Sequence, residues 1–321
     1  NPQSPSYPAL PFLSRKIQPN QGGSPFNVPV TWYGRPLGSE FSSPFSPKDI
    51  EQFNLSQKIN TNINETTELE ASLTISSHSN DHYRPDIIDS RFLEALNGTT
   101  LGQSNGNLVY WNIFDSSQNS QELIDYVRGA EVSSKDASLN NLGLIFRSEN
   151  DGYEIAYGFQ YNNEKLKITY DDISTAEFDG DGKIIKSADL FFLGGGINLS
   201  KNRNNYAAFF EIQPKPIENL DLKIAGRFEE FENDSSFDPK FSFKYAASEN
   251  ITLRASKSSS FSMPSMAQMF SSDINLGSVR DFNGDSPFVR QAQIGNPDLK
   301  PATSNNINIG FIFENSLQRL S

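Results

Sequence analysis

Both histidines of the chain lie in one short segment, Ser77-His78-Ser79-Asn80-Asp81-His82-Tyr83. Two histidines and a nearby aspartate are donor types that a zinc site uses. A spacing of four residues brings two imidazoles together on one face of a helix, whereas this segment follows an alternating run and is typical of a strand that enters a polar loop. We therefore expect a solvated pair and no metal site, with a metal or chelate contact as the alternative.

A second polar cluster, Asp179-Gly180-Asp181-Gly182-Lys183, has Asp171, Asp172 and Glu177 nearby. It shares its residue types with calcium-binding loops but lacks the ligand order and the closing Glu of an EF-hand. We interpret it as a turn, with a cation site as the alternative.

No catalytic residues and no cofactor are expected. A Ser-His-Asp arrangement would have to use one of the two histidines, and the chain has no Gly-x-Ser-x-Gly segment. The Gly194-Gly195-Gly196 run lacks the spacing and the lysine of a phosphate-binding loop. Adjacent carboxylates such as Glu229 and Glu230 point to opposite faces of a strand.

Aromatic and cationic residues are the most plausible ligand contacts, because stacking and charge can hold a chelate or a sugar. Those in segments expected to be loops are Trp32, Tyr33, Arg35, Trp111, Arg280, Phe282 and Arg290. The alternative is that they pack the loops together or belong to the aromatic girdle of a membrane barrel.

The elements around these residues are strands, since apolar and polar residues alternate in run after run. The clearest runs have every second residue apolar: Leu69 to Ile75, Tyr153 to Tyr161, Leu220 to Ile224, Phe241 to Tyr245, Ile251 to Ala255 and Ile307 to Phe313. The apolar phase slips between Tyr161 and Leu166, as a bulge or an added turn would cause. Period two predicts strands with two unlike faces.

Composition narrows the class of protein. No window holds about 18 consecutive apolar residues, which excludes a spanning helix but not a barrel, where only every second residue faces lipid. The absence of cysteine excludes a disulfide framework. The net charge of -12, with the 27 Lys and Arg scattered, argues against a nucleic-acid partner.

Connection lengths separate a membrane barrel from a soluble sandwich, because outer-membrane barrels alternate short turns with long loops. If 153–170 is one long strand, the connections 61–66, 149–152 and 214–217 are short, whereas 78–137, 171–202 and 258–303 are long. The connection 232–236 is unusually short for its side. Segment 1–49 has loop composition, and 78–137 contains two expected helices, near Ser90–Leu96 before Gly98 and near Ser120–Val127.

From Asp189 onward the sequence resembles the TonB-dependent outer-membrane receptors of Gram-negative bacteria. The residues that carry the resemblance are Phe191 to Gly196, Tyr206 to Ile212, Leu220 to Glu229, Phe237 to Phe241, Leu253 to Ser265 and Gly295 to Pro301. The front part is similar more loosely, at Gly22 to Phe26, Trp32 to Pro36 and Arg91 to Gly98. The family usually has Arg where this chain has Ser262.

The resemblance implies an all-β fold, an antiparallel transmembrane β-barrel of 22 strands with long extracellular loops, of which this chain holds about nine. Residues 1–321 would be a segment of one barrel domain, with the N-terminal plug and the C-terminal strands missing. The chain begins at Asn1 without an export signal, which also favours an internal segment. Such a piece would have two raw strand edges and should not be stable alone in water.

The resemblance further implies a place in the cell outer membrane and active uptake of a scarce, bulky nutrient such as a siderophore, cobalamin or an oligosaccharide. The implied partners are the TonB–ExbB–ExbD complex through the plug, outer-membrane lipid and lipopolysaccharide, and the nutrient. Haem is disfavoured because residues 265–295 contain no histidine. The two family boxes supply residues expected to shape loops: Phe261, Pro264, Asn296, Pro297, Leu299 and Pro301. A passive porin, a surface adhesin and a secreted β-rich binding protein remain alternatives.

Overall fold

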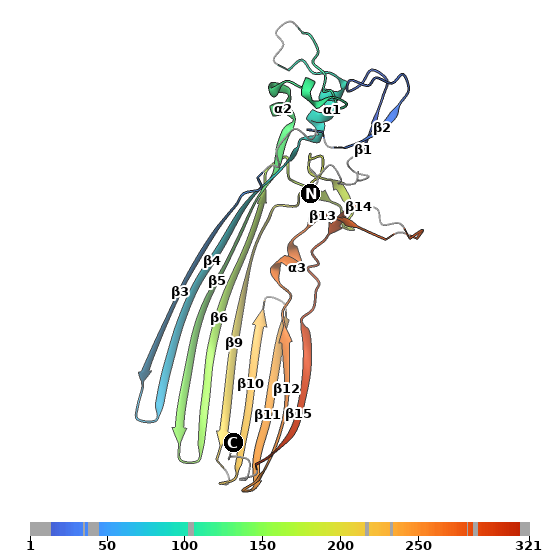
Figure 1. Cartoon of the computed structure of the whole chain (residues 1–321). Coiled ribbons are helices and arrows are strands. Elements are labelled where there is room, and N and C mark those ends of the chain that lie inside the picture. The colour runs from blue at the N-terminus through green and yellow to red at the C-terminus, as the bar shows by residue number, and fades with distance from the viewer. Residues whose placement is uncertain are drawn as a thin grey trace, which may run out of the picture.

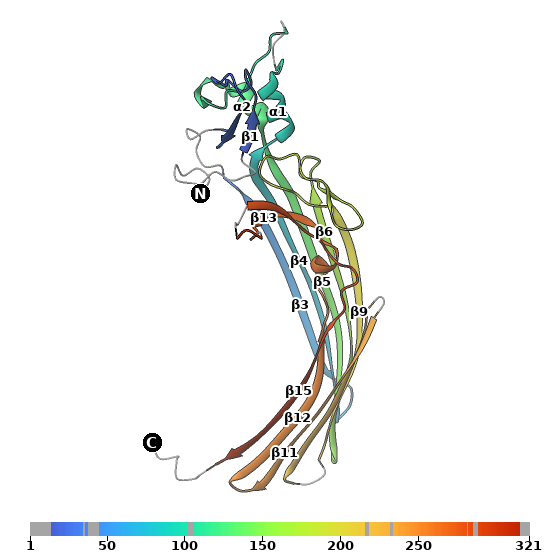
Figure 2. The same ribbon diagram turned by 90° about the vertical axis from the view of Figure 1, so that its right-hand side faces the viewer.

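A tall, curved wall of antiparallel strands makes up most of the molecule (Figures 1 and 2). The computed structural model describes residues 14–34, 36–37, 45–101, 106–215, 218–231, 234–280, 282–284 and 288–314. Within them, nine strands form one sheet in the order β15-β12-β11-β10-β9-β6-β5-β4-β3. The prediction of about nine antiparallel strands is confirmed.

The strands of the wall differ in length. They are β3 (Lys48–Asn62), β4 (Thr67–Ile87), β5 (Arg128–Asn150), β6 (Tyr153–Tyr170), β9 (Leu199–Pro214), β10 (Leu220–Phe231), β11 (Asp234–Ser248), β12 (Ile251–Ser262) and β15 (Ala302–Phe313). β3, β4, β5, β6 and β9 rise well above β10, β11, β12 and β15 (Figure 1).

The register gives the wall an apolar outer face and a polar inner face. Leu73, Leu142, Tyr161 and Tyr206 stand opposite one another across β4, β5, β6 and β9. The adjacent residue on each strand points to the opposite, inner face. There the equivalent row consists of Ser72, Gly143, Gln160 and Ala207. Because Leu73, Leu142 and Tyr206 of the outer row are exposed, this face suits contact with lipid.

The long strands continue past the apolar band. Outward-facing residues of β4 are apolar from Leu69 to Ile75, and the next three on this face, Ser77, Ser79 and Asp81, are polar. At about 3.4 Å per residue, the 21 residues of β4 span roughly 70 Å, against an apolar band of about 25 Å. The membrane-spanning part of β4 therefore ends near Ser77, and residues 78–87 lie above it.

This extension corrects the expected loop 78–137. His78 and His82 lie inside β4 and pair with β3 and β5, because backbone ladder hydrogen bonds continue after the hydrophobic alternation stops. The connection between β4 and β5 is accordingly shorter, at 88–127.

The expected bulge between Tyr161 and Leu166 is wrong. The register of β6 with both neighbours is continuous through this segment, so 153–170 is one strand, as the alternation of connections requires. Beyond the apolar band, Leu166, Ile168 and Tyr170 are apolar on the inner face because Leu199 and Phe270 pack against them there. The slip in the apolar phase of the sequence therefore marks the height at which apolar side chains of β6 move from the outer face to the inner face, where other protein residues cover them.

Short and long connections lie at opposite ends of the wall (Figure 1). The short ones are 63–66, 151–152, 215–219 and 249–250, and the long ones are 88–127, 171–198 and 263–301. On the long-loop side, β10 ends at Phe231 and β11 begins at Asp234, so this connection is short, as the sequence also indicated.

A cap with its own core sits above β4 and β5. It contains α1 (Asp89–Asn97), the short 3₁₀ turn η2 (Ser116–Gln118), α2 (Gln121–Val127) and the strand pair β1 (Ser14–Ile17) and β2 (Val30–Tyr33). Both predicted helices are confirmed, and Gly98 caps α1 at a φ of 103°. The pair β1–β2 was not expected within segment 1–49. Its Ile17 packs with Phe92, Leu96, Trp111 and Phe191.

The long connections 88–127, 171–198 and 263–301 together form a loop layer at the upper end of the wall. Three smaller elements complete this loop layer. They are the hairpin β7 (Glu177–Phe178) and β8 (Ile184–Lys186), the helix α3 (Met266–Phe270), and the hairpin β13 (Asp273–Ser278) and β14 (Phe288–Gln293). Among the described residues, no helix combines the length and apolarity needed to cross a membrane.

Candidate functional site

The inner face of the wall carries a lattice of ion pairs between neighbouring strands. Glu70 binds Lys58 at 2.8 Å and Arg147 at 3.0 Å. Arg203 binds Glu164 at 2.5 Å and donates to the Pro264 carbonyl at 2.9 Å. These side chains make the inner face hydrophilic, as a path for polar solutes requires.

A groove of about 670 Å³ runs over β6, β9, β10, β11 and β12 on this inner face. Arg227 pairs with Glu229 and donates to the Gln160 side chain at 2.8 Å. Phe209 and Phe231 contribute apolar surface, and the Arg227 guanidinium lies 5.7 Å from the Phe209 ring centre. The groove therefore combines paired charges with aromatic surface.

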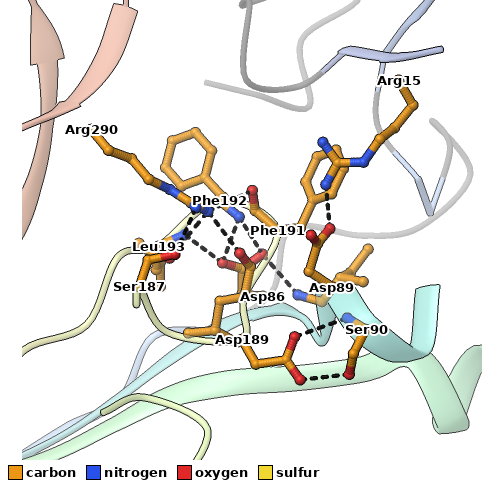
Figure 3. Close-up of polar contacts among 12 residues, drawn as sticks. Arg15, Asp86, Asp89, Ser90, Ser187, Asp189, Phe191, Phe192, Leu193 and Arg290 are labelled. Atoms are coloured by element: carbon orange, nitrogen blue, oxygen red, sulfur yellow. Dashed lines mark hydrogen bonds and ion pairs between the residues drawn. The ribbon is translucent and has the colours of Figure 1, made fainter. Parts of the chain in front are cut away.

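At the upper end, the carboxylate of Asp86 ties the loop layer to β4 (Figure 3). It accepts hydrogen bonds from the backbone N–H groups of Leu193 at 2.6 Å, Ile87 at 2.7 Å and Phe192 at 3.0 Å. Burial raises the pKa of the Asp86 carboxyl to about 6, although these donors and the Arg290 guanidinium act in the opposite direction. Asp86 thus fixes the connection 171–198 at the cost of a buried charge.

Arg290 of β14 holds the same connection from its other side (Figure 3). Its guanidinium donates to the carbonyls of Leu190 at 2.7 Å and Phe191 at 3.1 Å and to the Ser187 hydroxyl at 3.1 Å. Burial lowers the pKa of Arg290, while Asp89 and Asp86 raise it. Asp86 of β4 and Arg290 of β14 therefore both hold segment 187–193 in place by hydrogen bonds.

Comparison with known proteins identifies the family. Residues 6–321 match the model of the TonB dependent receptor-like β-barrel family. The chain belongs to this family. Its members are transport receptors, not enzymes, of the outer membrane of Gram-negative bacteria. No curated protein matches the chain.

Solved TonB-dependent receptors are among the structures similar to this chain. The siderophore receptor PirA from Acinetobacter baumannii has 17% identity, covers 84% of this chain and 33% of its own, and has a TM-score of 0.49. The ferric enterobactin receptor PfeA from Pseudomonas aeruginosa has 14% identity, 85% and 41% coverage and a TM-score of 0.45. The copper transporter OprC has 12% identity, 84% and 37% coverage and a TM-score of 0.49. The chain thus spans 33% to 41% of the length of these three proteins.

The two family boxes of this TonB-dependent receptor barrel are connected through α3. Pro264 lies just before α3, and the turn at Asn296 returns to α3, where its N–H donates to the Gln268 carbonyl at 3.0 Å. Asn296 Oδ1 accepts from the N–H of Asp298 at 2.9 Å, which shapes the turn between Pro297 and Leu299. Pro301 follows directly before β15. Phe261 lies 5.4 Å from the Phe231 ring, at the edge of the inner groove.

Helix α3 was missed by the sequence reasoning although a signal was present. Ser265 and Gln268 form a reciprocal capping box, and Ser-x-x-Gln before a short apolar stretch is its sequence signature. Asp86 was also missed, because a single acid near a strand end has no distinguishing pattern.

The predicted ligand-contact residues are spread over the loop layer. Trp111 is fully buried in the cap core, where its ring meets Phe92 at 5.8 Å, and Trp32 packs against the same core. Arg280 is exposed and the Phe282 side chain is 109% exposed. Tyr33 lies on β2, and Arg35 lies outside the described residues. The structure does not gather these residues into one site, and their ligand role stays a prediction.

The histidine pair and the Asp179–Lys183 turn have protein groups as their hydrogen-bonding neighbours. His78 Nδ1 lies 3.0 Å from Gln52 Nε2, and His82 Nε2 lies 3.0 Å from Ser46 Oγ. Asp179 Oδ1 accepts from the N–H of Lys183 at 2.8 Å within the β7–β8 turn. In the described part of the chain, no three His, Asp or Glu side chains are grouped to hold a metal ion.

Proposed function

We propose that this chain forms part of the barrel, and several ligand-capturing loops, of a receptor that takes up a scarce, bulky nutrient by energised transport. Family membership supports outer-membrane uptake. The observation that carries the proposal is the two-faced wall, apolar outside and ion-paired inside, with its long loops gathered over one end. In this arrangement the loops would meet the nutrient first and the polar inner face would form its path.

The proposed partners follow from the faces of the wall. A closed barrel leaves no strand edge in lipid, so we propose that residues 1–321 are a segment of one barrel domain completed by further strands. Lipopolysaccharide would contact the polar part of the outer face above the apolar band, where Ser79 stands opposite Asp136. The TonB–ExbB–ExbD complex would act through a plug.

The nutrient class extends from metal chelates to cobalamin and oligosaccharides. Arg280 and Phe282 are the exposed loop residues best placed to contribute charge and stacking, because neither side chain is buried in the loop layer. The buried Trp111 and the engaged Arg290 would support the loops instead.

Uptake assays in a Gram-negative host that produces the receptor test this proposal. Radiolabelled ferric enterobactin, ferric citrate, cyanocobalamin and maltohexaose are supplied to cells with and without TonB. We expect one probe to accumulate only when TonB is present and to stop accumulating when a protonophore is added. Equal accumulation without TonB would indicate a passive porin, and surface binding without uptake would indicate an adhesin; either result overturns the proposal.

A further inference from the structure

A second, smaller cavity of about 190 Å³ lies between the upper inner face of the wall and the loop layer. Lys48, His82, Ser133 and Tyr170 stand opposite one another across β3, β4, β5 and β6 and form its central row. Asn80 and Lys135 form the row below, and Arg84 and Glu131 the row above. Gly195 and β13 cover these rows. The volume corresponds to roughly six water molecules.

Three cations meet two carboxylates around this cavity. Arg84 and Glu131 are paired at 2.8 Å, and the second Glu131 oxygen accepts from the Gly195 N–H at 3.2 Å. Within the described residues, Lys48 and Lys135 have no ion-pair partner. Burial lowers the pKa of His82, and Lys48 and Arg84 lower it further, which favours the neutral imidazole.

The remaining carboxylate, Asp273 of β13, already has a hydrogen-bond partner. Its Oδ1 accepts from the Asn275 side chain at 2.9 Å. Burial raises its pKa, whereas Lys135 lowers it. An anion in the cavity would therefore meet two unpaired ammonium groups and one acid that is already hydrogen-bonded.

Neutral groups that can form hydrogen bonds also line the cavity. Asn80 Oδ1 is buried and has no hydrogen-bond partner among the described residues, and a buried acceptor without a donor costs about 1–3 kcal/mol. Burial raises the pKa of Tyr170, so its hydroxyl stays protonated and able to donate. The lining thus offers two cations and a hydroxyl donor, and it needs a donor for one amide oxygen.

We propose that this cavity binds a hydroxycarboxylate group of the transported ligand. The carboxylate would lie between Lys48 and Lys135, and the hydroxyl would donate to Asn80 Oδ1. This inference rests on the proposed uptake function and narrows the nutrient to ligands with a carboxylate-bearing arm.

Citrate is a suitable probe, because it carries carboxylates and a hydroxyl in one small molecule. Titration calorimetry would measure citrate binding to the purified receptor in detergent, with glycerol as the uncharged comparison. The double variant Lys48→Met and Lys135→Met should bind citrate about tenfold more weakly or worse. Lys135→Arg, which retains the charge, should bind within about threefold of wild type.

The matched control is Lys165→Met with Lys167→Met, which removes the same charge from the outer face at a similar height. It should leave citrate binding unchanged. Equal affinity of wild type and the inner double variant, equal loss in the outer control, or no citrate binding by a folded wild-type receptor would overturn the inference. TonB-dependent accumulation of radiolabelled ferric citrate, measured in cells that produce the same variants, keeps the two proposals separate. No TonB-dependent accumulation by a wild-type receptor that binds citrate counts against the uptake function alone, whereas equal TonB-dependent accumulation by wild type and the inner double variant counts against the cavity alone.

Discussion

Asp86 is a single residue on which two parts of the loop layer depend. Its carboxylate is buried where three N–H groups of β4 and segment 187–193 converge, and Arg290 and Asp89 lie nearby. Each charge-assisted hydrogen bond contributes about 1.5–3 kcal/mol, but the buried charge opposes this gain. Stability of the closed loop layer should therefore depend on pH.

The direction follows from the pKa, which burial raises from 3.8 to about 6. In that range the buried carboxyl retains a proton that the opened loop layer would release, so stability falls as pH rises from about 4 to about 6, by at most roughly 3 kcal/mol. Hydrogen exchange of a peptide covering 187–196 should show this fall in wild type and a flat profile in Asp86→Asn. The exposed Asp81→Asn variant should retain the wild-type profile; a flat wild-type profile would contradict the assignment.

Arg290 and Arg280 give a matched comparison of structural and ligand roles. Arg290→Ala removes hydrogen bonds to three carbonyls and a hydroxyl and should loosen segment 187–193 by about 1–3 kcal/mol. Arg280→Ala should not, since its side chain is exposed. Protease cleavage within the loop layer reports the difference, and equal cleavage of both variants would show that Arg290 does not hold this segment.

At the scale of elements, the glycine run 194–196 lets two parts of the connection 171–198 pass close to each other. Gly195 has a φ of 70°, and a Cβ there would lie 1.9 Å from the Ser174 carbonyl oxygen. Gly195→Ala should therefore destabilise the loop layer by about 1–3 kcal/mol. Gly180→Ala, where a Cβ meets open space, should change the thermal unfolding midpoint of the receptor little. Similar midpoints for both variants would contradict this packing.

Alternation in the sequence was sufficient to predict the strands within the apolar band, since lipid contact demands period two there. Above the apolar band, alternation did not predict where the strands end or which face their apolar residues cover. The end of β4 and the inner apolar residues Leu166 and Ile168 depend on ladder hydrogen bonds and on a loop layer that packs against the wall from distant sequence. The ligand-contact predictions rested on residue type alone, and type does not distinguish the buried Trp111 from the exposed Phe282.

At the scale of the whole molecule, the account depends on the wall having one lipid face and one solute face. The ion pair of Glu70 with Arg147, the inner groove and the small cavity all lie on the face opposite to Leu73 and Leu142. A sheet buried inside a soluble protein would protect both faces from lipid. In a barrel wall, successive residues along a strand contact lipid and water in turn, whereas in a buried sheet neither set of residues contacts lipid.

The most direct test is cysteine scanning along β4, β5 and β6, since the chain has no native cysteine. Single cysteines at Leu73, Leu142 and Phe159 face outward, and cysteines at Thr74, Gly143 and Gln160 face inward. In outer membranes, a fluorophore at outward positions should be quenched by lipid-borne nitroxide and one at inward positions by aqueous iodide. Alternation of the two quenchers with period two is the predicted result. Aqueous quenching at both sets of positions, or lipid quenching at neither, would contradict the barrel wall and the uptake path built on it.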